Sequence, residues 1–238
     1  MANGLNVQGS GVFSYSVGSL YPEGASLASL LSFGAGGPTV LFGAQPSVIG
    51  TPTLNAYSFI GTAGKGYDTS VPDTVTKTML VWAKYPAVQT STALPMGAYN
   101  GVNTGDTIFL NHTSSADLFE GIAATASGGT QSIVSGGTGS TTFSNSAAYY
   151  LFAARFTATT AQMSYVLNGA IVNGAASTLA TRYTPSRTVH VGAPFDTTSL
   201  GSVEITGAGL WTTALTDAEI LQMATFFQNL KGSSVTIG

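Results

Sequence analysis

Acidic residues are the side chains with the clearest catalytic potential, because two carboxylates facing one glycosidic bond can cleave it. Two close acidic pairs occur, Asp117 with Glu120 and Asp217 with Glu219. A retaining glycosidase holds its two carboxyl groups about 5 Å apart on either side of the bond. Asp117 and Glu120 lack a third acidic partner, and Asp217 and Glu219 are better explained by the start of a helix. We therefore predict no catalytic residues and a protein that is not an enzyme.

The two histidines could each act as a general base or as a metal ligand. His190 stands between Val189 and Val191, so in a strand its side chain points to the face opposite the two valines. That position favours a histidine at the surface or at a pocket edge over a member of a catalytic triad. His112 lies in the triplet 111–113, a glycosylation-type sequence that has meaning only on a secretory route. Neither histidine is predicted to take part in catalysis.

A loop rich in Asn and Gly, residues 99–106, carries the chemistry expected of a binding site. An aromatic ring can stack on the apolar face of a sugar, while amide and carboxylate groups hydrogen-bond its hydroxyls. The same oxygen-rich set could instead hold a calcium ion, the one cofactor that the sequence suggests. A plain turn without a ligand is the alternative, since Asn and Gly are common in turns. The candidate ligand-binding residues are Tyr99, Asn100, Asn103 and Asp106, together with Asp196 in a second loop.

The composition of the 238 residues indicates an all-β protein with a sparsely charged surface. Only 7% of the residues are charged, against roughly 25% in an average soluble domain. The 30 glycines favour many short strands and tight turns over long helices. With seven Lys and Arg and a net charge of −3, binding to nucleic acid or to a membrane surface is not expected. Because there is no cysteine, stability must come from packing and strand pairing, with oligomerisation as a further source.

Short alternating segments separated by turn residues predict many strands. Val203 and Ile205 alternate with polar residues at 202, 204 and 206, a period of two that suits a half-buried strand, and the strand resumes at Ala208–Trp211 after Gly207. The dipeptide Asn168–Gly169 supplies the positive φ angles of a type I′ turn and predicts a hairpin. The Gly/Ser/Thr-rich segment 125–145 is interpreted as loop or as polar edge strands, and Trp82 and Trp211 are expected in the core. The other predicted strands are Tyr57–Ile60, Thr78–Tyr85, Thr107–Asn111, Leu118–Ala124, Tyr149–Phe156, Met163–Leu167 and Val189–Val191.

One helix is predicted close to the C-terminus. Thr216 and Glu219 match a capping box, in which each side chain accepts a hydrogen bond from a backbone N–H of the other residue. Leu215 and Ile220 occupy the positions of a hydrophobic staple, and Lys231 followed by glycine marks the helix end. The apolar face of this helix is formed by Ile220, Met223, Ala224 and Phe227.

Four stretches of the chain, taken in order, resemble laminin-G-like domains of the concanavalin A-like lectin/glucanase group. Residues 201–231 resemble the closing strand of those domains and its Leu-Ser/Thr-x-x-Glu-Ile phrase. Residues 55–84 resemble the opening strands, 149–172 the paired central strands with their Asn-Gly turn, and 187–193 the strand that ends in Ile/Val-Gly. The resemblance implies a two-sheet antiparallel β-sandwich of the jelly-roll, concanavalin A-like type with one short C-terminal helix.

Residues 1–50 do not match this resemblance and are predicted to form an N-terminal arm or attachment segment, with residues 51–238 as the laminin-G-like domain. The segment has an alternating stretch at Val12–Val17 and an apolar cluster between Leu27 and Phe33. The functional interpretation is an arm that docks on a neighbouring subunit. The alternative is that these residues add strands and a helical turn to the same sandwich.

The resemblance also implies a function, because laminin-G-like modules of this kind occur on bacteriophage tails, fibres and capsid surfaces. We therefore expect a non-enzymatic virion protein with a lectin-like module, bound to other virion proteins and to copies of itself, with surface glycans as a further candidate partner. The N-terminus has neither the basic start nor the apolar run of a secretory signal, so synthesis in the host cytoplasm is expected. The alternatives are a glycan-processing enzyme or its carbohydrate-binding module, and a purely structural subunit that binds no sugar.

Overall fold

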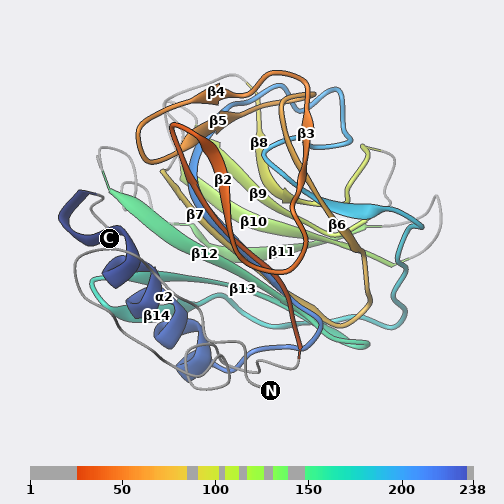
Figure 1. The fold of residues 1–238 in the computed structure, drawn as a ribbon. Helices are drawn as coiled ribbons and strands as arrows, with labels where there is room; N and C mark the ends of the chain where they lie inside the picture. Colours follow the sequence, from red (N-terminus) through yellow and green to blue (C-terminus); the bar gives the residue numbers. More distant parts are fainter. Residues whose placement is uncertain are drawn as a thin grey trace, which may run out of the picture.

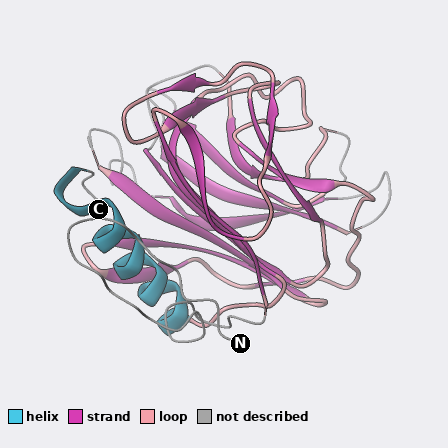
Figure 2. Ribbon diagram, viewed as in Figure 1, coloured by secondary structure: helices cyan, strands magenta, loops and turns pink. Residues whose placement is uncertain are grey.

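The computed structural model describes residues 26–84, 91–101, 105–112, 117–125, 131–138 and 148–234. In this part of the chain two antiparallel sheets lie face to face, and one α-helix lies against the outer side of one sheet (Figure 1). Among the described residues strands dominate, and the helix lies at one side of the sandwich (Figure 2). The predicted two-sheet sandwich with one helix near the C-terminus is confirmed.

The first sheet has ten strands and forms the scaffold for the helix. Its main order is β14-β13-β12-β7-β17-β1-β2, while β15 pairs with β13 and β5 joins β17 to β4. The strands are β1 (Leu27–Gly34), β2 (Gly37–Phe42), β4 (Thr53–Leu54), β5 (Phe59–Gly61), β7 (Lys77–Lys84), β12 (Tyr149–Phe156), β13 (Thr160–Leu167), β14 (Ala170–Asn173), β15 (Ser177–Thr178) and β17 (Val203–Trp211).

The second sheet has seven strands in the order β11-β10-β9-β8-β16-β6-β3. Not all of them have the β-branched and aromatic pattern that marks a strand in sequence; β8, for example, reads ALPMG. The strands are β3 (Ser47–Ile49), β6 (Gly66–Pro72), β8 (Ala93–Gly97), β9 (Thr107–His112), β10 (Asp117–Ala124), β11 (Gln131–Thr138) and β16 (Thr188–Val191).

Both faces of the ten-stranded sheet are covered, which gives the molecule two hydrophobic cores. In β7, Met79 and Val81 point between the sheets, whereas Leu80 and Trp82 point to the helix. The same division applies to β17, which is buried on both faces over almost its whole length. The predicted alternation holds at the start of the strand, where Val203 and Ile205 are buried and Glu204 is partly exposed, but from Thr206 onward the strand is buried on both faces.

Helix α2 (Asp217–Lys231) has the predicted cap and is followed by the 3₁₀ turn η1 (Gly232–Ser234). Glu219 N donates to Thr216 Oγ1 at 3.3 Å, and Thr216 N donates to Glu219 Oε2 at 2.6 Å. The four predicted face residues are buried, and the ring of Phe227 stacks on Trp82 with centroids 4.2 Å apart. The helix therefore packs on the sheet through an aromatic pair.

The second half of the predicted N-terminal arm belongs to the sandwich. Strand β1 lies between β17 and β2 in the ten-stranded sheet, and β3 forms the edge of the other sheet. Leu30 points to the helix and Leu31 to the inter-sheet core, so the apolar cluster marks a strand buried on both faces rather than a helical turn. The boundary at residue 50 must therefore move to the N-terminal side of β1. Residues 1–25, with Val12–Val17, lie outside the described residues.

Two further sequence predictions are confirmed. Asn168 and Gly169 have φ angles of 52° and 75° and join β13 to β14 as a hairpin. Trp82 and Trp211 have no exposed surface. Within the segment 125–145, the structure describes β11, which forms an edge strand and agrees with the second of the two interpretations.

Candidate functional site

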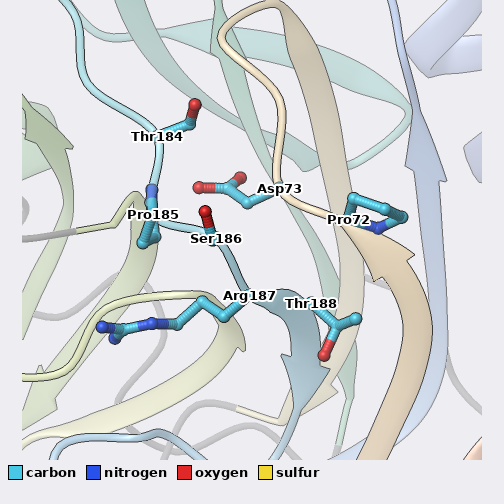
Figure 3. Close-up of a pocket in the computed structure, with 7 residues that line it drawn as sticks. All are labelled: Pro72, Asp73, Thr184, Pro185, Ser186, Arg187 and Thr188. Atoms are coloured by element: carbon cyan, nitrogen blue, oxygen red, sulfur yellow. The ribbon is translucent and has the colours of Figure 1, made fainter.

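A pocket of about 490 Å³ lies where β6 ends and β16 begins (Figure 3). These two strands pair antiparallel with Thr188 opposite Pro72, so the end of one and the start of the other form adjoining walls. We call this cavity the β6–β16 pocket. Its walls combine polar and apolar surface in similar amounts, which suits a ligand with hydroxyl groups on an apolar ring. The lining residues are Pro72, Asp73, Thr184, Pro185, Ser186, Arg187 and Thr188.

The segment 179–187, which leads into β16, is fixed to its surroundings by main-chain hydrogen bonds. Leu179 N donates to Thr159 O at 2.7 Å, and Tyr183 N donates to Ala124 O at 3.0 Å. Asp73 N donates to Arg187 O at 2.9 Å and closes the pocket at the other end. Because the segment is anchored at several points, the pocket is preformed. Binding of a ligand therefore costs little conformational entropy in this segment.

Four charged side chains lie buried behind this pocket: Asp73, Lys77, Asp106 and Arg182, here called the buried charge cluster. Their exposed fractions are at most 2%. Lys77 forms ion pairs with both carboxylates, and Arg182 Nη2 lies 2.5 Å from Asp106 Oδ2. Two acids and two bases balance one another when all are ionised, so the cluster presents no net charge to the pocket.

The carboxyl group of Asp73 is the most perturbed member of this cluster. Burial raises the pKa of Asp73 to about 6, against the opposing effect of the Lys77 ammonium 2.5 Å away. In Figure 3 the Asp73 carboxylate points toward the segment that carries Thr184 and Ser186. Its side chain has no exposed surface, however. A ligand would therefore touch the hydroxyls and the guanidinium of the lining residues rather than this carboxylate.

Two of the sequence-predicted loops come together beside the pocket. Gly101 lies so close to Asp196 that a Cβ atom at position 101 would stand 2.6 Å from Asp196 Oδ1. Burial and the nearby Asp196 charge both raise the pKa of Tyr99. Asn100 is half-buried between these residues, so three predicted site residues, Tyr99, Asn100 and Asp196, lie in one region. Asn103 lies outside the described residues.

The two predicted carboxylates contact the chain itself. Asp106 is fully buried in the charge cluster, and its Oδ1 accepts a hydrogen bond from Ala124 N at 2.9 Å. Asp196 accepts from Thr198 N at 2.9 Å and from Ser199 Oγ at 2.5 Å. Burial disfavours its ionised form, but the hydrogen bonds from Ser199 and Thr198 outweigh burial and hold the pKa of Asp196 below its usual value. Both carboxylates thus fix loops.

A stack of three side chains connects the pocket with these loops. The rings of His190 and Phe195 are 3.8 Å apart, and the Arg187 guanidinium lies 5.1 Å from the Phe195 centroid. Arg187 Nη1 also donates to Ala98 O at 3.2 Å, next to Tyr99. His190 is half-buried on the face opposite Val189, as predicted, and burial lowers its pKa. We call these three residues the Arg187–Phe195–His190 stack.

Sequence reasoning did not identify the residues that line the pocket. The usable signal was the polar segment 181–188, in which Arg182 and Arg187 flank Pro185. Two of the seven basic residues of the whole chain fall within these six positions, and a proline there predicts a rigid turn. Their different roles depend on burial, which the local sequence does not encode: Arg182 is buried in the charge cluster, whereas Arg187 lines the cavity.

Among the described residues, no group of three or more His, Asp and Glu side chains is arranged to hold a metal ion. The helices that the structure describes include none with the length and apolarity needed to cross a membrane.

Comparison with known proteins shows the fold but no family. Neither protein-family models nor curated protein sequences give a match. The receptor-binding domain of botulinum neurotoxin type G is similar in structure, with a TM-score of 0.59, 10% identity, and coverage of 83% of this chain and 50% of that one. The binding domain of Paraclostridial mosquitocidal protein 1 has a TM-score of 0.59, 10% identity and coverage of 85% and 53%.

A mutant of the NanB sialidase from Streptococcus pneumoniae is also similar, with a TM-score of 0.51, 14% identity, and coverage of 70% of this chain and 27% of that one. The chain thus spans about half the length of the two binding domains it matches. At these identities the likeness concerns the fold alone. The chain shares a β-sandwich fold with these binding domains and with the sialidase.

Proposed function

We propose that the protein is a non-enzymatic glycan-binding module whose binding site is the β6–β16 pocket together with the Arg187–Phe195–His190 stack at its edge. The observation that carries the proposal is a preformed cavity of mixed polar and apolar surface with an aromatic ring beside it. The shared fold with binding domains of other proteins supports it.

The lining chemistry fits a hydroxylated ligand. Thr184, Ser186 and Thr188 contribute hydroxyl groups that both donate and accept hydrogen bonds, and Arg187 contributes donors in a fixed plane. Phe195 is half-buried and offers an apolar surface close to these groups. Sugars need this combination, because their rings have polar edges and apolar faces.

The positions of the nearby carboxylates support a binding role rather than hydrolysis. Cleavage of a glycosidic bond requires two carboxyl groups that reach the bond from facing sides. Asp73 and Asp106 have no exposed side-chain surface and share Lys77 as an ion-pair partner. They can influence the pocket through its wall but cannot contact a substrate. We therefore expect bound glycans to be released unchanged.

The proposal is tested by screening the full chain on a glycan array, with calcium and with a chelator, because the 99–106 loop was predicted to take a sugar or a calcium ion. A Ser186→Trp variant should fill the cavity, since Ser186 is an exposed lining residue. The matched control is Gln222→Trp, which places the same ring on the exposed side of α2.

We expect selected glycans to bind wild type and Gln222→Trp equally, and Ser186→Trp at least about tenfold more weakly, a loss of roughly 1.4 kcal/mol. Equal binding by Ser186→Trp would show that glycans bind outside this pocket. No binding to any glycan, with or without calcium, would reject the proposed function.

A second proposal is that the module is a self-associating subunit of a virus particle, as the family resemblance implies for bacteriophage proteins. The observation that favours assembly is a set of large apolar side chains exposed on a molecule with few charges, among them Val48 at 59% and Leu200 at 61%. Light scattering of the wild type and of a Val48→Lys/Leu200→Lys variant tests it. A wild type that stays monomeric at high concentration would count against self-association.

A further inference from the structure

Arg187 differs from the other basic residues of the chain in the surroundings of its positive charge. Four of the seven Lys and Arg side chains form ion pairs with carboxylates, and Lys231 donates to two backbone carbonyls. Lys65 is exposed on the turn that precedes β6. Arg187 lines the β6–β16 pocket, and within the described residues no carboxylate forms an ion pair with it. The four paired residues are Lys77, Lys84, Arg155 and Arg182.

The guanidinium of Arg187 has N–H donors that are not used in bonds to the described residues. It carries five N–H donors, and within the described residues one bond to a protein acceptor is present, from Nη1 to Ala98 O at 3.2 Å. None of its nitrogens is buried without a partner, so the remaining donors reach solvent or the pocket. Phe195 supports one side of the planar group and limits its freedom. The group is thus held in place, charged, and open on the ligand side.

The carboxylates nearest to Arg187 are engaged elsewhere. Asp73 is paired with Lys77 inside the buried charge cluster, which is neutral as a whole. Asp196 is satisfied by hydroxyl and amide groups of its own loop, and Asp68 faces His190 with its oxygen 3.9 Å from Nε2. Within the part of the chain that the structure describes, the positive charge at the pocket edge therefore has no carboxylate counter-ion.

We propose that Arg187 makes this site selective for glycans that carry an anionic group, either a carboxylate or a sulfate ester. This inference rests on the proposed glycan-binding function. The guanidinium pairs with the anion through two parallel N–H donors, while the hydroxyl side chains of the pocket hold the neighbouring sugar hydroxyls. An anionic group suits this position because it neutralises the charge of Arg187, which is partly shielded from solvent.

The test uses an array in which each neutral glycan is printed beside its uronic acid derivative and its 6-O-sulfated derivative. Wild type is compared with Arg187→Gln, Arg187→Lys and Lys65→Gln. The last variant removes the same unit of charge from an exposed turn and so controls for net charge. Thermal unfolding of each variant verifies that it is folded.

We expect wild type and Lys65→Gln to prefer the anionic forms by about tenfold or more, since hydrogen bonds to charged groups are the stronger ones. Arg187→Gln should bind neutral and anionic forms alike. Arg187→Lys should retain more of the preference for sulfate than for carboxylate, because an ammonium is a point charge without the planar fork. Should Arg187→Gln fail to fold, the inference is tested by whether Arg187→Lys retains more preference for sulfate than for carboxylate.

Two results would overturn the inference while leaving the proposed function intact. The first is equal binding of neutral and anionic glycans by wild type. The second is an anion preference that persists in Arg187→Gln. Absence of binding to every glycan on the array would reject both the inference and the function on which it rests.

Discussion

At the scale of single residues, Asp73 couples the stability of the fold to pH. Burial raises the pKa of Asp73 to about 6, above the value near 4 of the unfolded chain. A raised carboxyl pKa means that the protonated form stabilises the folded state. That contribution is fully present below about pH 4 and is lost as the pH rises through about 6.

We predict that an Asp73→Asn variant loses this pH dependence. Asn mimics the protonated acid, so the free energy of unfolding of the variant, relative to wild type, should rise by on the order of 2 kcal/mol between pH 4 and pH 7. Urea unfolding of both proteins at the two pH values measures this difference in the free energy of unfolding. A difference that stays constant with pH would mean that the Lys77 ion pair cancels the effect of burial.

The residues of the candidate site show what sequence could and could not predict. Tyr99, Asn100 and Asp196 were selected for their chemistry, and the structure brings them together beside Gly101. Asp106 was selected for the same reason, yet it is fully buried. A carboxylate in a Gly-rich loop looks the same in sequence whether it meets solvent or a buried lysine 29 positions away.

At the scale of elements, helix α2 begins where its capping box predicts. The Thr216 side chain accepts from Glu219 N and satisfies one of the free N–H groups at the helix start. We predict that Thr216→Ala lowers the free energy of unfolding by about 1 kcal/mol.

The control is Thr225→Ala in the same helix. Thr225 is exposed and bonds only to Leu221 O, so its replacement should be neutral or slightly stabilising. Chemical denaturation of both variants compares the two, and equal losses would contradict a capping role.

Contact between β17 and α2 requires a residue without a side chain. A Cβ atom at Gly207 would lie 2.0 Å from Phe227 Cζ, and the Phe227 ring cannot retreat because it stacks on Trp82. We predict that Gly207→Ala costs about 1–3 kcal/mol. Gly36→Ala, at a position with open space, should be close to neutral.

A double-mutant cycle with Phe227→Leu identifies the cause. The cost of Gly207→Ala should fall when the ring is replaced by the shorter side chain, so the two changes should be non-additive by more than about 0.5 kcal/mol. Additive free energies of unfolding would show that the strand, rather than the helix contact, requires the glycine.

At the scale of the whole molecule, the buried charge cluster ties the two sheets to each other. Lys77 is the first residue of β7 in the ten-stranded sheet, and Asp106 directly precedes β9 in the seven-stranded sheet. Removing one partner leaves uncompensated buried charge. We predict that Asp106→Ala destabilises the fold by about 3–5 kcal/mol, measured by chemical unfolding. Asp68→Ala, which removes a partly exposed carboxylate, should cost less than about 1 kcal/mol.

Much of the architecture followed from sequence because periodicity and caps are local. The strand β12 was predicted with its observed bounds, as was the hairpin at Asn168. Strands β6 and β8 were not predicted. The sequence of β8, ALPMG, contains Gly and Pro, which are depleted in strands, whereas β6 does alternate at Tyr67, Thr69 and Val71 but also contains Gly, Asp and Pro. The arm boundary failed for a related reason, since a strand covered on both faces lacks the alternation that reveals one.

The place of β17 in the sheet has a consequence for biosynthesis. This strand lies between β7 and β1, so the middle of the ten-stranded sheet is filled by residues 203–211. A nascent chain that has emerged from the ribosome only as far as β16 has a gap at that place, with the inner edges of β7 and β1 unpaired. Completion of the sheet must wait for the late segment, and until then the exposed edges are a target for chaperones and for neighbouring nascent chains.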